Sequence, residues 1–189
     1  MNPLCMKDSM KKIKIYGITE SFEKIDEYNY KECDLIQLRD KSSTENNLLP
    51  YIEKLRLKYP LSKIVLNYYN FSILDKKDSL LIDGVHYQIS NIGKREKRRK
   101  YDFLSCHNEE DLKIALNNNF DFVTLSPVFK TESHPNEKRI LGVEKFNSLV
   151  GKYRSLKIFG LGGLNSKNIG FLKSFGIAGI SNFKRVKRQ

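Results

Sequence analysis

Long apolar runs and paired cysteines are missing from this sequence. No stretch approaches the roughly 20 consecutive apolar residues that cross a bilayer, and the start, MNPLCMKDSMKK, lacks the apolar core of a signal peptide. The three cysteines, Cys5, Cys33 and Cys106, form no CxxC pair, which favours reduced thiols over disulfides or zinc ligands. We therefore expect a cytoplasmic protein without membrane contact, in which Cys33 and Cys106 pack in the core.

Positive charge is abundant, with a net charge of +12, and it gathers in two runs, 94–100 and 184–188. Such runs bind nucleic acid, draw in phosphorylated metabolites, or simply form a solvated helix face and a basic tail. Neither run is interleaved with aromatic residues, and no helix-turn-helix, RNA-recognition or zinc-finger signature accompanies them. Nucleic acid is therefore the least favoured partner, and charge alone does not choose between the others.

The order of apolar stretches predicts one domain over residues 1–189, with a polar leader at 1–12 and a basic tail at 184–189, because no linker composition divides the chain. Short apolar strands are expected at 14–19, 34–41 (with a polar carboxyl end), 63–68, 83–87, 102–107, 122–126, 157–160 and 176–180. Helices are expected at 21–30, from 43 or 44 to 59, from 108, at 142–153, and from 165 or 166 to 171. The helix ending at 59 has apolar positions at Leu48, Leu49, Ile52, Leu55 and Leu57. Alternation at about 20 to 25 residues per unit predicts an α/β fold, a small (βα)8 TIM barrel with a closed parallel sheet.

Polar residues follow the apolar part of most of these strands. In a parallel barrel the active site lies at the carboxyl ends of the strands, so we expect these side chains to share one face. They are Thr19, Gln37, Arg39, Lys41, Asn67, His86, Ser105, His107 and Ser126. All three histidines of the chain, His86, His107 and His134, are expected there.

The stretch 157–184 is rich in glycine and is expected to form a strand, a glycine turn, a helix and a second strand. The turn Gly160-Leu161-Gly162-Gly163 and the second strand at 176–180 leave backbone N–H groups free of side-chain obstruction. One interpretation is a phosphate site. The other is that these glycines only permit tight packing, and the motif alone does not decide between them.

Seven short motifs occur in an order that resembles the thiamine phosphate synthase family, including its TenI branch of thiazole tautomerases. They are YGIT at 16–19, QLRDK at 37–41, DGVH at 83–86, SCHNEED at 105–111, SPVFKTES at 126–133, GLGGLNSKN at 160–168 and GIAGIS at 176–181. The resemblance implies a small (βα)8 barrel that binds a phosphorylated thiazole. It also implies that the phosphate is held by Gly162 and Gly163 and by the backbone around Phe183 and Lys184.

The same resemblance suggests substrate contacts. Gln37 and Lys41 match positions that contact the pyrimidine diphosphate, Ser105 matches a substrate-site serine, and Thr131 and Ser133 match the hydroxyl residues of a PTxTK-like loop. Arg39, Asn67 and His86 join them as substrate-binding candidates because of their strand-end positions. The alternative is a solvated strand end for Gln37 and Lys41, and an ordinary loop for Thr131 and Ser133.

Two departures concern magnesium. Where the synthases carry an Asn-Asp pair, this chain has Asn67-Tyr68, and its residues 86–91 lack the second aspartate. Mg²⁺ usually needs one or two carboxylates besides substrate phosphates, so we expect no cofactor unless the chain is a synthase. In that case Asp40, Asp83 or substrate phosphate would supply the ligands. A third departure is the absence, at 126–129, of the histidine that TenI proteins place after strand six.

Missing carboxylates favour a TenI-like, metal-independent tautomerase acting on thiazole phosphate, because proton transfer needs no metal. Its candidate catalytic residues are His107 and His134, although a purely structural role for His107 is the alternative. The competing hypotheses are a thiamine phosphate synthase, which condenses hydroxymethylpyrimidine diphosphate with thiazole phosphate, and a non-catalytic barrel that binds a small phosphorylated ligand. The oligomeric state is left open, with a homo-oligomer as one possibility.

Overall fold

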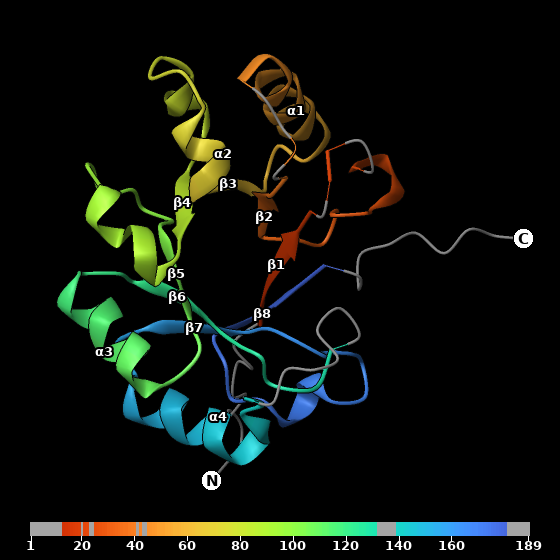
Figure 1. Cartoon of the computed structure of the whole chain (residues 1–189). Helices are drawn as coiled ribbons and strands as arrows, with labels where there is room; N and C mark the ends of the chain where they lie inside the picture. The colour runs from red at the N-terminus through yellow and green to blue at the C-terminus, as the bar shows by residue number, and fades with distance from the viewer. Residues whose placement is uncertain are drawn as a thin grey trace, which may run out of the picture.

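Eight parallel strands close into a barrel in the computed structural model (Figure 1). Each strand pairs with its neighbour in the sequence, and β8 pairs with β1, where Lys14 lies opposite Gly176. The strands are β1 (Lys14–Ile18), β2 (Leu35–Leu38), β3 (Lys63–Asn67), β4 (Gly84–Tyr87), β5 (Phe103–Cys106), β6 (Phe122–Leu125), β7 (Lys157–Gly160) and β8 (Gly176–Gly179). The structure describes residues 13–19, 21–22, 25–40, 42, 45–131 and 139–180. The predicted closed (βα)8 barrel is confirmed.

The helices between the strands differ in type and in length. The α-helices are α1 (Glu45–Lys58), α2 (Tyr68–Ser72), α3 (Glu109–Asn117) and α4 (Gly142–Lys152), and the 3-10 helices are η1 (Ile25–Glu27), η2 (Asp78–Leu81), η3 (Ile89–Lys94) and η4 (Ile169–Phe171). The predicted helices at 21–30 and 165–171 are wrong, since η1 and η4 are short 3-10 turns. Before η4, Asn168 Oδ1 accepts from the Asn165 N–H and Asn165 Oδ1 accepts from the Lys167 N–H. These local bonds compete with a helix.

Helix α1 packs one face against the barrel. Leu48, Ile52 and Leu55 are fully buried, as predicted, but Leu57 is 85% exposed. Positions 48, 52 and 55 follow the spacing that places residues on one helix face, whereas residues two apart do not share a face. The prediction for Leu57 was therefore wrong. The expected capping positions 43 and 44 lie outside the described residues. Cys33 and Cys106 are buried, as predicted.

Inside the barrel, side chains form layers of changing polarity. The amino-terminal part is aromatic, with the Phe103 ring 5.1 Å from Phe122 and 5.3 Å from Phe159. Two residues further along β5 and β6 come the neutral polar side chains of Ser105 and Thr124. The next inward positions belong to the charged and polar residues at the carboxyl ends of the strands. Because successive residues of a strand alternate in direction, each layer recurs at a spacing of two residues.

Aspartates mark the amino-terminal ends of several strands. Asp34, Asp83 and Asp102 each stand just before a strand and accept a hydrogen bond from a backbone N–H of the preceding strand. The donors are Ile15, Ile64 and Val85, each at 2.9 Å. This repeated bond fixes the register between neighbouring strands at that end.

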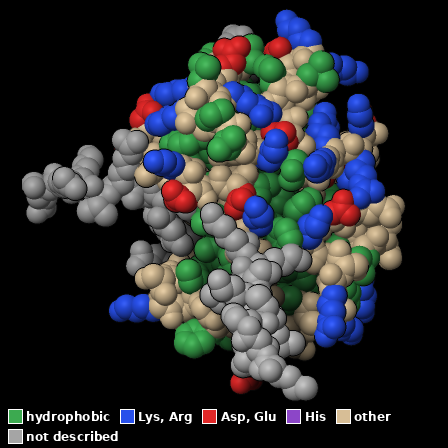
Figure 2. Space-filling model, turned by 180° about the vertical axis from the view of Figure 1, so that it is seen from behind, with side chains coloured by type: hydrophobic (Ala, Val, Ile, Leu, Met, Phe, Trp, Pro, Cys, Tyr) green, Lys and Arg blue, Asp and Glu red, His purple; other side chains and the backbone are tan. Residues whose placement is uncertain are grey.

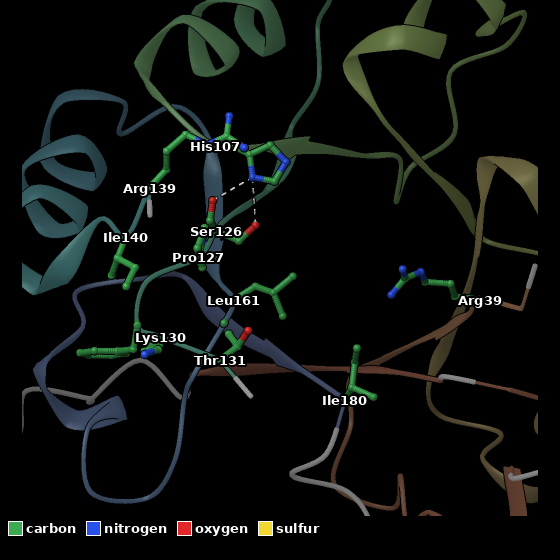
Figure 3. A pocket seen from close by; sticks show the side chains of 12 residues that line it. Arg39, His107, Ser126, Pro127, Lys130, Thr131, Arg139, Ile140, Leu161 and Ile180 are labelled. Carbon is green, nitrogen blue, oxygen red and sulfur yellow. Dashed lines mark hydrogen bonds between the residues drawn. The ribbon is translucent and has the colours of Figure 1, made fainter. Parts of the chain in front are cut away.

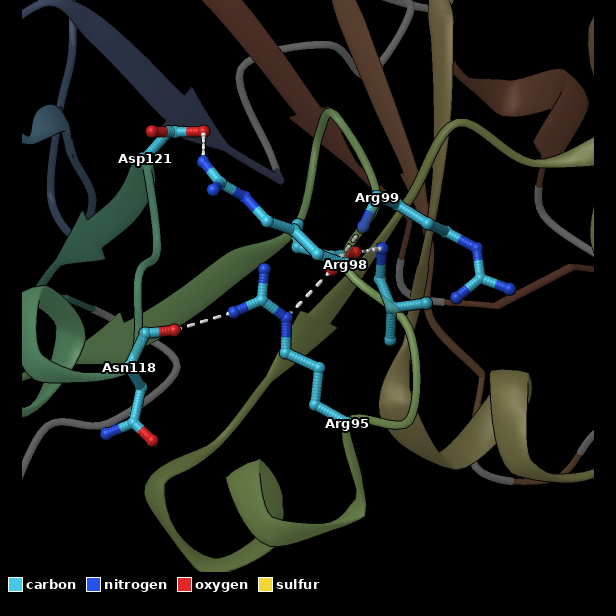
Figure 4. A network of polar contacts seen from close by, with 7 residues as sticks. Arg95, Arg98, Arg99, Asn118 and Asp121 are labelled. Atoms are coloured by element: carbon cyan, nitrogen blue, oxygen red, sulfur yellow. Dashed lines mark hydrogen bonds and ion pairs between the residues drawn. The ribbon is translucent and has the colours of Figure 1, made fainter.

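Three arginines of the basic run 94–100 contact residues of the barrel (Figure 4). Two of them pair with aspartates at the amino-terminal ends of strands, and the third packs on an aromatic ring. Arg95 Nε lies 3.0 Å from Asp102 Oδ2, Arg98 lies 2.5 Å from Asp121, and the Arg99 guanidinium stacks 4.7 Å from the Phe71 ring. The expectation of a solvated helix face is therefore wrong for these arginines, because helix η3 ends at Lys94. Lysine and arginine side chains are spread over the face seen in Figure 2 and mixed with acidic ones. None of the described helices is long and apolar enough to span a membrane.

Candidate active site

A cavity of about 250 Å³ lies at the carboxyl ends of the strands (Figure 3). It is formed by residues that follow β2, β5, β6, β7 and β8. They are Arg39, His107, Ser126, Pro127, Phe129, Lys130, Thr131, Arg139, Ile140, Leu161, Gly162 and Ile180. The structure thus brings together four of the predicted site residues: Arg39, His107, Thr131 and Gly162. Their roles in binding or catalysis stay predictions.

The charged side chains of this lining are all cationic. Arg39, Lys130 and Arg139 are exposed, and none of the described residues that line the cavity is acidic. Arg39 lies across the cavity from Lys130 and Arg139 (Figure 3). Positive charge on two sides of a concave site raises the local concentration of anions. The arrangement therefore suits a ligand or a pair of ligands with negative groups at both ends.

His107 presents one ring nitrogen to the backbone. Its Nδ1 lies 2.9 Å from the carbonyl oxygen of Ser126, and a carbonyl only accepts, so Nδ1 carries the hydrogen. The neutral imidazole then keeps a lone pair on Nε2. The His107 backbone N–H donates to Asp111 Oδ2 at 2.7 Å, which holds the start of α3 against this residue. His107 is thus oriented as a possible base or hydrogen-bond acceptor in the cavity.

His86 is not at the open face, which corrects the expectation that the histidines share it. The residue is only 7% exposed and points into the barrel one layer below the cavity. Its Nε2 lies 3.0 Å from Ser105 Oγ and 3.2 Å from Thr124 Oγ1. On the other side, Nδ1 contacts Gln37 Nε2 and lies 3.2 Å from Tyr16 Oη. Burial, helped by the charge of Arg39, lowers the pKa of His86 to about 3.

Gln37 is buried in this same network and is not a solvated strand end, whereas Ser105 is partly exposed. Asn67 lies at the end of β3, where its Oδ1 accepts from the Asn70 N–H at 2.9 Å and caps α2. Helix α2 was not predicted. None of these three residues lines the cavity, and substrate binding by them remains a prediction.

No cluster of metal-ligating side chains marks a magnesium site among the described residues. No group of three His, Cys, Asp or Glu side chains within the described part of the chain could hold a metal ion. Asp83 lies at the opposite end of the barrel and pairs with Arg56 at 2.8 Å, so it is not the substitute ligand that a synthase would need. Asp40 is at the correct end, but its carboxylate accepts from the Phe22 N–H at 2.8 Å and from Ser42 Oγ at 2.6 Å. We therefore assign no chemical step to a metal.

Both glycines of the predicted phosphate turn have positive φ, 98° at Gly162 and 65° at Gly163. A Cβ on Gly163 would lie 2.4 Å from the Lys130 carbonyl oxygen, and one on Gly162 would lie 2.8 Å from Pro127 Cβ. The Phe129 N–H donates to the Gly162 carbonyl at 3.0 Å. These contacts support the packing interpretation, and Gly162 also lines the cavity. A phosphate role for Gly162 and Gly163 remains a prediction.

Five predicted site residues, Lys41, Ser133, His134, Phe183 and Lys184, lie outside the described residues. The sequence reasoning in turn missed Lys130, Arg139 and Ile140. Lys130 directly precedes Thr131 in the motif SPVFKTES at 126–133, and this position could have indicated that Lys130 lies at the site. Arg139 and Ile140 follow the loop and showed no pattern of their own.

Comparison with known proteins identifies relatives over most of the chain. A thiamine-phosphate synthase of Thermoplasma acidophilum is 28% identical over 193 residues, covering 93% of this chain and 86% of that protein. One from Fusobacterium nucleatum is 27% identical and covers 94% of this chain and 90% of the relative. A thiamine-phosphate synthase of Prochlorococcus marinus is 29% identical, but this chain spans only 50% of its length.

The fold has a solved counterpart. A thiamine phosphate pyrophosphorylase from Pyrococcus furiosus superposes with a TM-score of 0.70 over 90% of this chain and 87% of that chain, at 20% sequence identity. That likeness concerns the barrel. Residues 14–186 match the family described as thiamine monophosphate synthase, which includes every strand and the whole cavity lining. The chain belongs to the thiamine monophosphate synthase family.

Proposed function

We propose that this chain is a thiamine-phosphate synthase, which joins hydroxymethylpyrimidine diphosphate to thiazole phosphate. The observation that carries the proposal is the cavity at the carboxyl ends of the strands, with Arg39 on one side, Lys130 and Arg139 on the other, and no acidic residue in its described lining. Two substrates with negative groups suit such a site. The relatives compared above are named synthases, so this proposal replaces the tautomerase as the favoured activity.

The reaction needs little covalent help from the protein. The thiazole nitrogen forms a bond to the methylene carbon of the pyrimidine, the bond from that carbon to the diphosphate oxygen breaks, and the electron pair leaves with the diphosphate. Catalysis then consists of aligning the two rings and stabilising the negative charge of the leaving group. Arg39, Lys130 and Arg139 are the described cations that could do this, and Thr131 adds a hydroxyl donor.

Formation of thiamine phosphate from the two purified substrates tests the proposal. We expect turnover by the full chain, measured by separating the product from both substrates. A parallel assay with EDTA examines the metal, because no group of three metal-ligating side chains occurs among the described residues. Turnover that persists in EDTA would show that cations of the chain suffice. Absence of product both with and without added magnesium would contradict the synthase.

A tautomerase is the second candidate, favoured by the orientation of His107. Its hydrogen-bonded Nδ1 leaves Nε2 free to accept a proton in a cavity that suits a phosphate. Isomerisation of the thiazole phosphate precursor by wild type, with loss in a His107→Asn variant, would support this activity. Saturable binding of thiazole phosphate without either reaction would instead indicate a non-catalytic barrel.

A further inference from the structure

The polar network beneath the cavity determines where hydrogens can lie. Four side chains, Tyr16 on β1, Gln37 on β2, Ser105 on β5 and Thr124 on β6, converge on the imidazole of His86 on β4. The five residues of this network lie on five different strands of the barrel, so the network is part of the fold. Each contact has a donor and an acceptor, and the side-chain chemistry assigns them.

The amide nitrogen of Gln37 can only donate a hydrogen bond. With the amide oriented as in the structure, this nitrogen donates to Tyr16 Oη at 2.9 Å and also faces His86 Nδ1, which accepts in this arrangement. A neutral imidazole with an accepting Nδ1 carries its hydrogen on Nε2. That hydrogen points at Ser105 Oγ, 3.0 Å away, and at Thr124 Oγ1, 3.2 Å away.

We propose that His86 is a positioning residue, which fixes the Ser105 hydroxyl as a hydrogen-bond donor to the ligand. A hydroxyl that accepts from Nε2–H must turn its own hydrogen away from the ring. Thr124 is 1% exposed, so its hydroxyl is confined to the interior, whereas Ser105 is partly exposed. Ser105 also lies two residues before His107 on the inward side of β5, directly below the cavity layer.

A fixed donor is selective. The ligand has to present an acceptor, such as a ring nitrogen or a phosphate oxygen, at the position above Ser105. A ligand group that presents its own hydrogen there would leave two donors facing each other and would bind less tightly. Only the identity of the ligand rests on the proposed synthase activity; the direction of the hydrogen bonds does not.

The groups around His86 keep this direction constant over the physiological range. Its neighbours Tyr16, Gln37, Ser105 and Thr124 are neutral, and the charged group acting on it is Arg39. Burial and that positive charge lower the pKa of His86 to about 3. The imidazole therefore takes up no second proton between pH 5 and 8, and Nδ1 remains an acceptor for Gln37.

Nitrogen NMR of the full chain labelled with ¹⁵N-histidine tests the hydrogen assignment without requiring activity. We expect the His86 signals to show a hydrogen on Nε2 and no titration between pH 5 and 8. His107 provides an internal contrast, because its bond to the Ser126 carbonyl predicts the opposite tautomer. A His86 hydrogen on Nδ1, or titration of His86 within that range, would overturn the proposal.

A double-mutant cycle then tests whether His86 acts through Ser105. Binding of hydroxymethylpyrimidine diphosphate is measured by calorimetry for Ser105→Ala, His86→Gln and the double variant. Loss of one good hydrogen bond weakens binding about tenfold, so we expect that loss from Ser105→Ala and no further loss in the double variant. Thr124→Val, which leaves Ser105 as the acceptor of Nε2–H, is the matched comparison and should lose less.

Losses that multiply in the double variant would contradict the positioning role, since His86 would then act independently of Ser105. If wild type binds no pyrimidine diphosphate, the synthase proposal fails, while the NMR result still decides the tautomer and the cycle is repeated with thiazole phosphate. If the His86 variant does not fold, the proposal is tested by ligand binding to Ser105→Ala together with the tautomer of His86 in the wild-type NMR spectrum. Unchanged binding of both probes by Ser105→Ala would overturn the proposal.

Discussion

The two ends of the barrel use charge in opposite ways. At the amino-terminal end, Asp34, Asp83, Asp102 and Asp121 each pair with a lysine or arginine. At the carboxyl end, the described lining of the cavity carries cations and no carboxylate. Paired charges fix the ends of strands, whereas an excess of one sign attracts a ligand. One chain thus separates stability from binding by position along the barrel axis.

The charged side chains at the two ends of the barrel also differ in burial. The side chains of Arg95 and Asp102 are 10% and 1% exposed, and Asp102 also accepts from the backbone N–H groups of Val85 and Arg99. Arg39 at the other end is exposed to the cavity. Removing a partner from the buried pair leaves an uncompensated buried charge, while removing the exposed Arg39 leaves no buried charge unpaired and acts on the ligand site. Stability measurements should therefore respond at one end and ligand measurements at the other.

The largest expected effect is that of Asp102→Asn, which keeps the shape but removes the charge opposite Arg95. Loss of one partner of a buried ion pair costs about 3 kcal/mol, and we expect this decrease in the free energy of unfolding in urea. Asp121→Asn is the matched control, because its pair with Arg98 is about half exposed. That variant should lose less than about 1 kcal/mol. Equal losses in both variants would remove the distinction between buried and exposed pairs.

Next in size is Arg39→Gln, which tests the binding end. Removing one group that stabilises developing negative charge typically costs about 100-fold in turnover, and we expect this loss in kcat/KM for thiamine phosphate formation. The free energy of unfolding should change little because Arg39 is exposed. Arg98→Gln, the same substitution at the opposite end, should retain kcat/KM. Equal activity of the two variants would mean that the cavity cations do not act on the substrates.

Sequence patterns predicted the barrel well because buried strands are read from local hydrophobicity. The eight strand positions are right to within a few residues, as at β4, expected at 83–87 and found at Gly84–Tyr87. The short turns were harder. Asn165 and Asn168 resemble helix caps in sequence, but their side chains bond to nearby backbone groups and no α-helix follows.

The candidate site was only partly predictable. Strand-end position placed Arg39 and His107 at the cavity, but it could not tell that His86 points inward one layer lower. That depth depends on the register of the whole barrel, which no local pattern encodes. Lys130 and Arg139 line the cavity from positions after β6, and Lys130 is placed by packing against the glycine turn, where Phe129 bonds to Gly162 and the Lys130 carbonyl lies against Gly163.

Gly163→Ala separates packing from binding within the binding end. Its φ of 65° and the short approach to the Lys130 carbonyl predict a loss of about 2 kcal/mol in the free energy of unfolding, since a Cβ there is strained. Phosphate binding should weaken with it, because the displaced loop carries Lys130 and Thr131. Gly170→Ala, where a Cβ would meet nothing within 4 Å, is the control. Weaker binding at unchanged stability would instead favour the direct phosphate role.

The smallest expected effect concerns Asp40, the carboxylate at the binding end that is used for structure. Burial alone would raise its pKa, but hydrogen bonds from Ser42 and from the Phe22 N–H outweigh this and lower the pKa below its usual value of 3.8. A group whose pKa is lower in the folded state contributes stability above its unfolded pKa and loses it as the pH falls through the folded one. We therefore expect the free energy of unfolding of wild type to decrease below about pH 4 more steeply than that of Asp40→Asn, as measured by urea titrations from pH 3 to 6. Parallel pH curves for the two proteins would show that folding does not lower the pKa of Asp40, and that its hydrogen bonds to Ser42 and Phe22 do not stabilise the carboxylate in the folded protein.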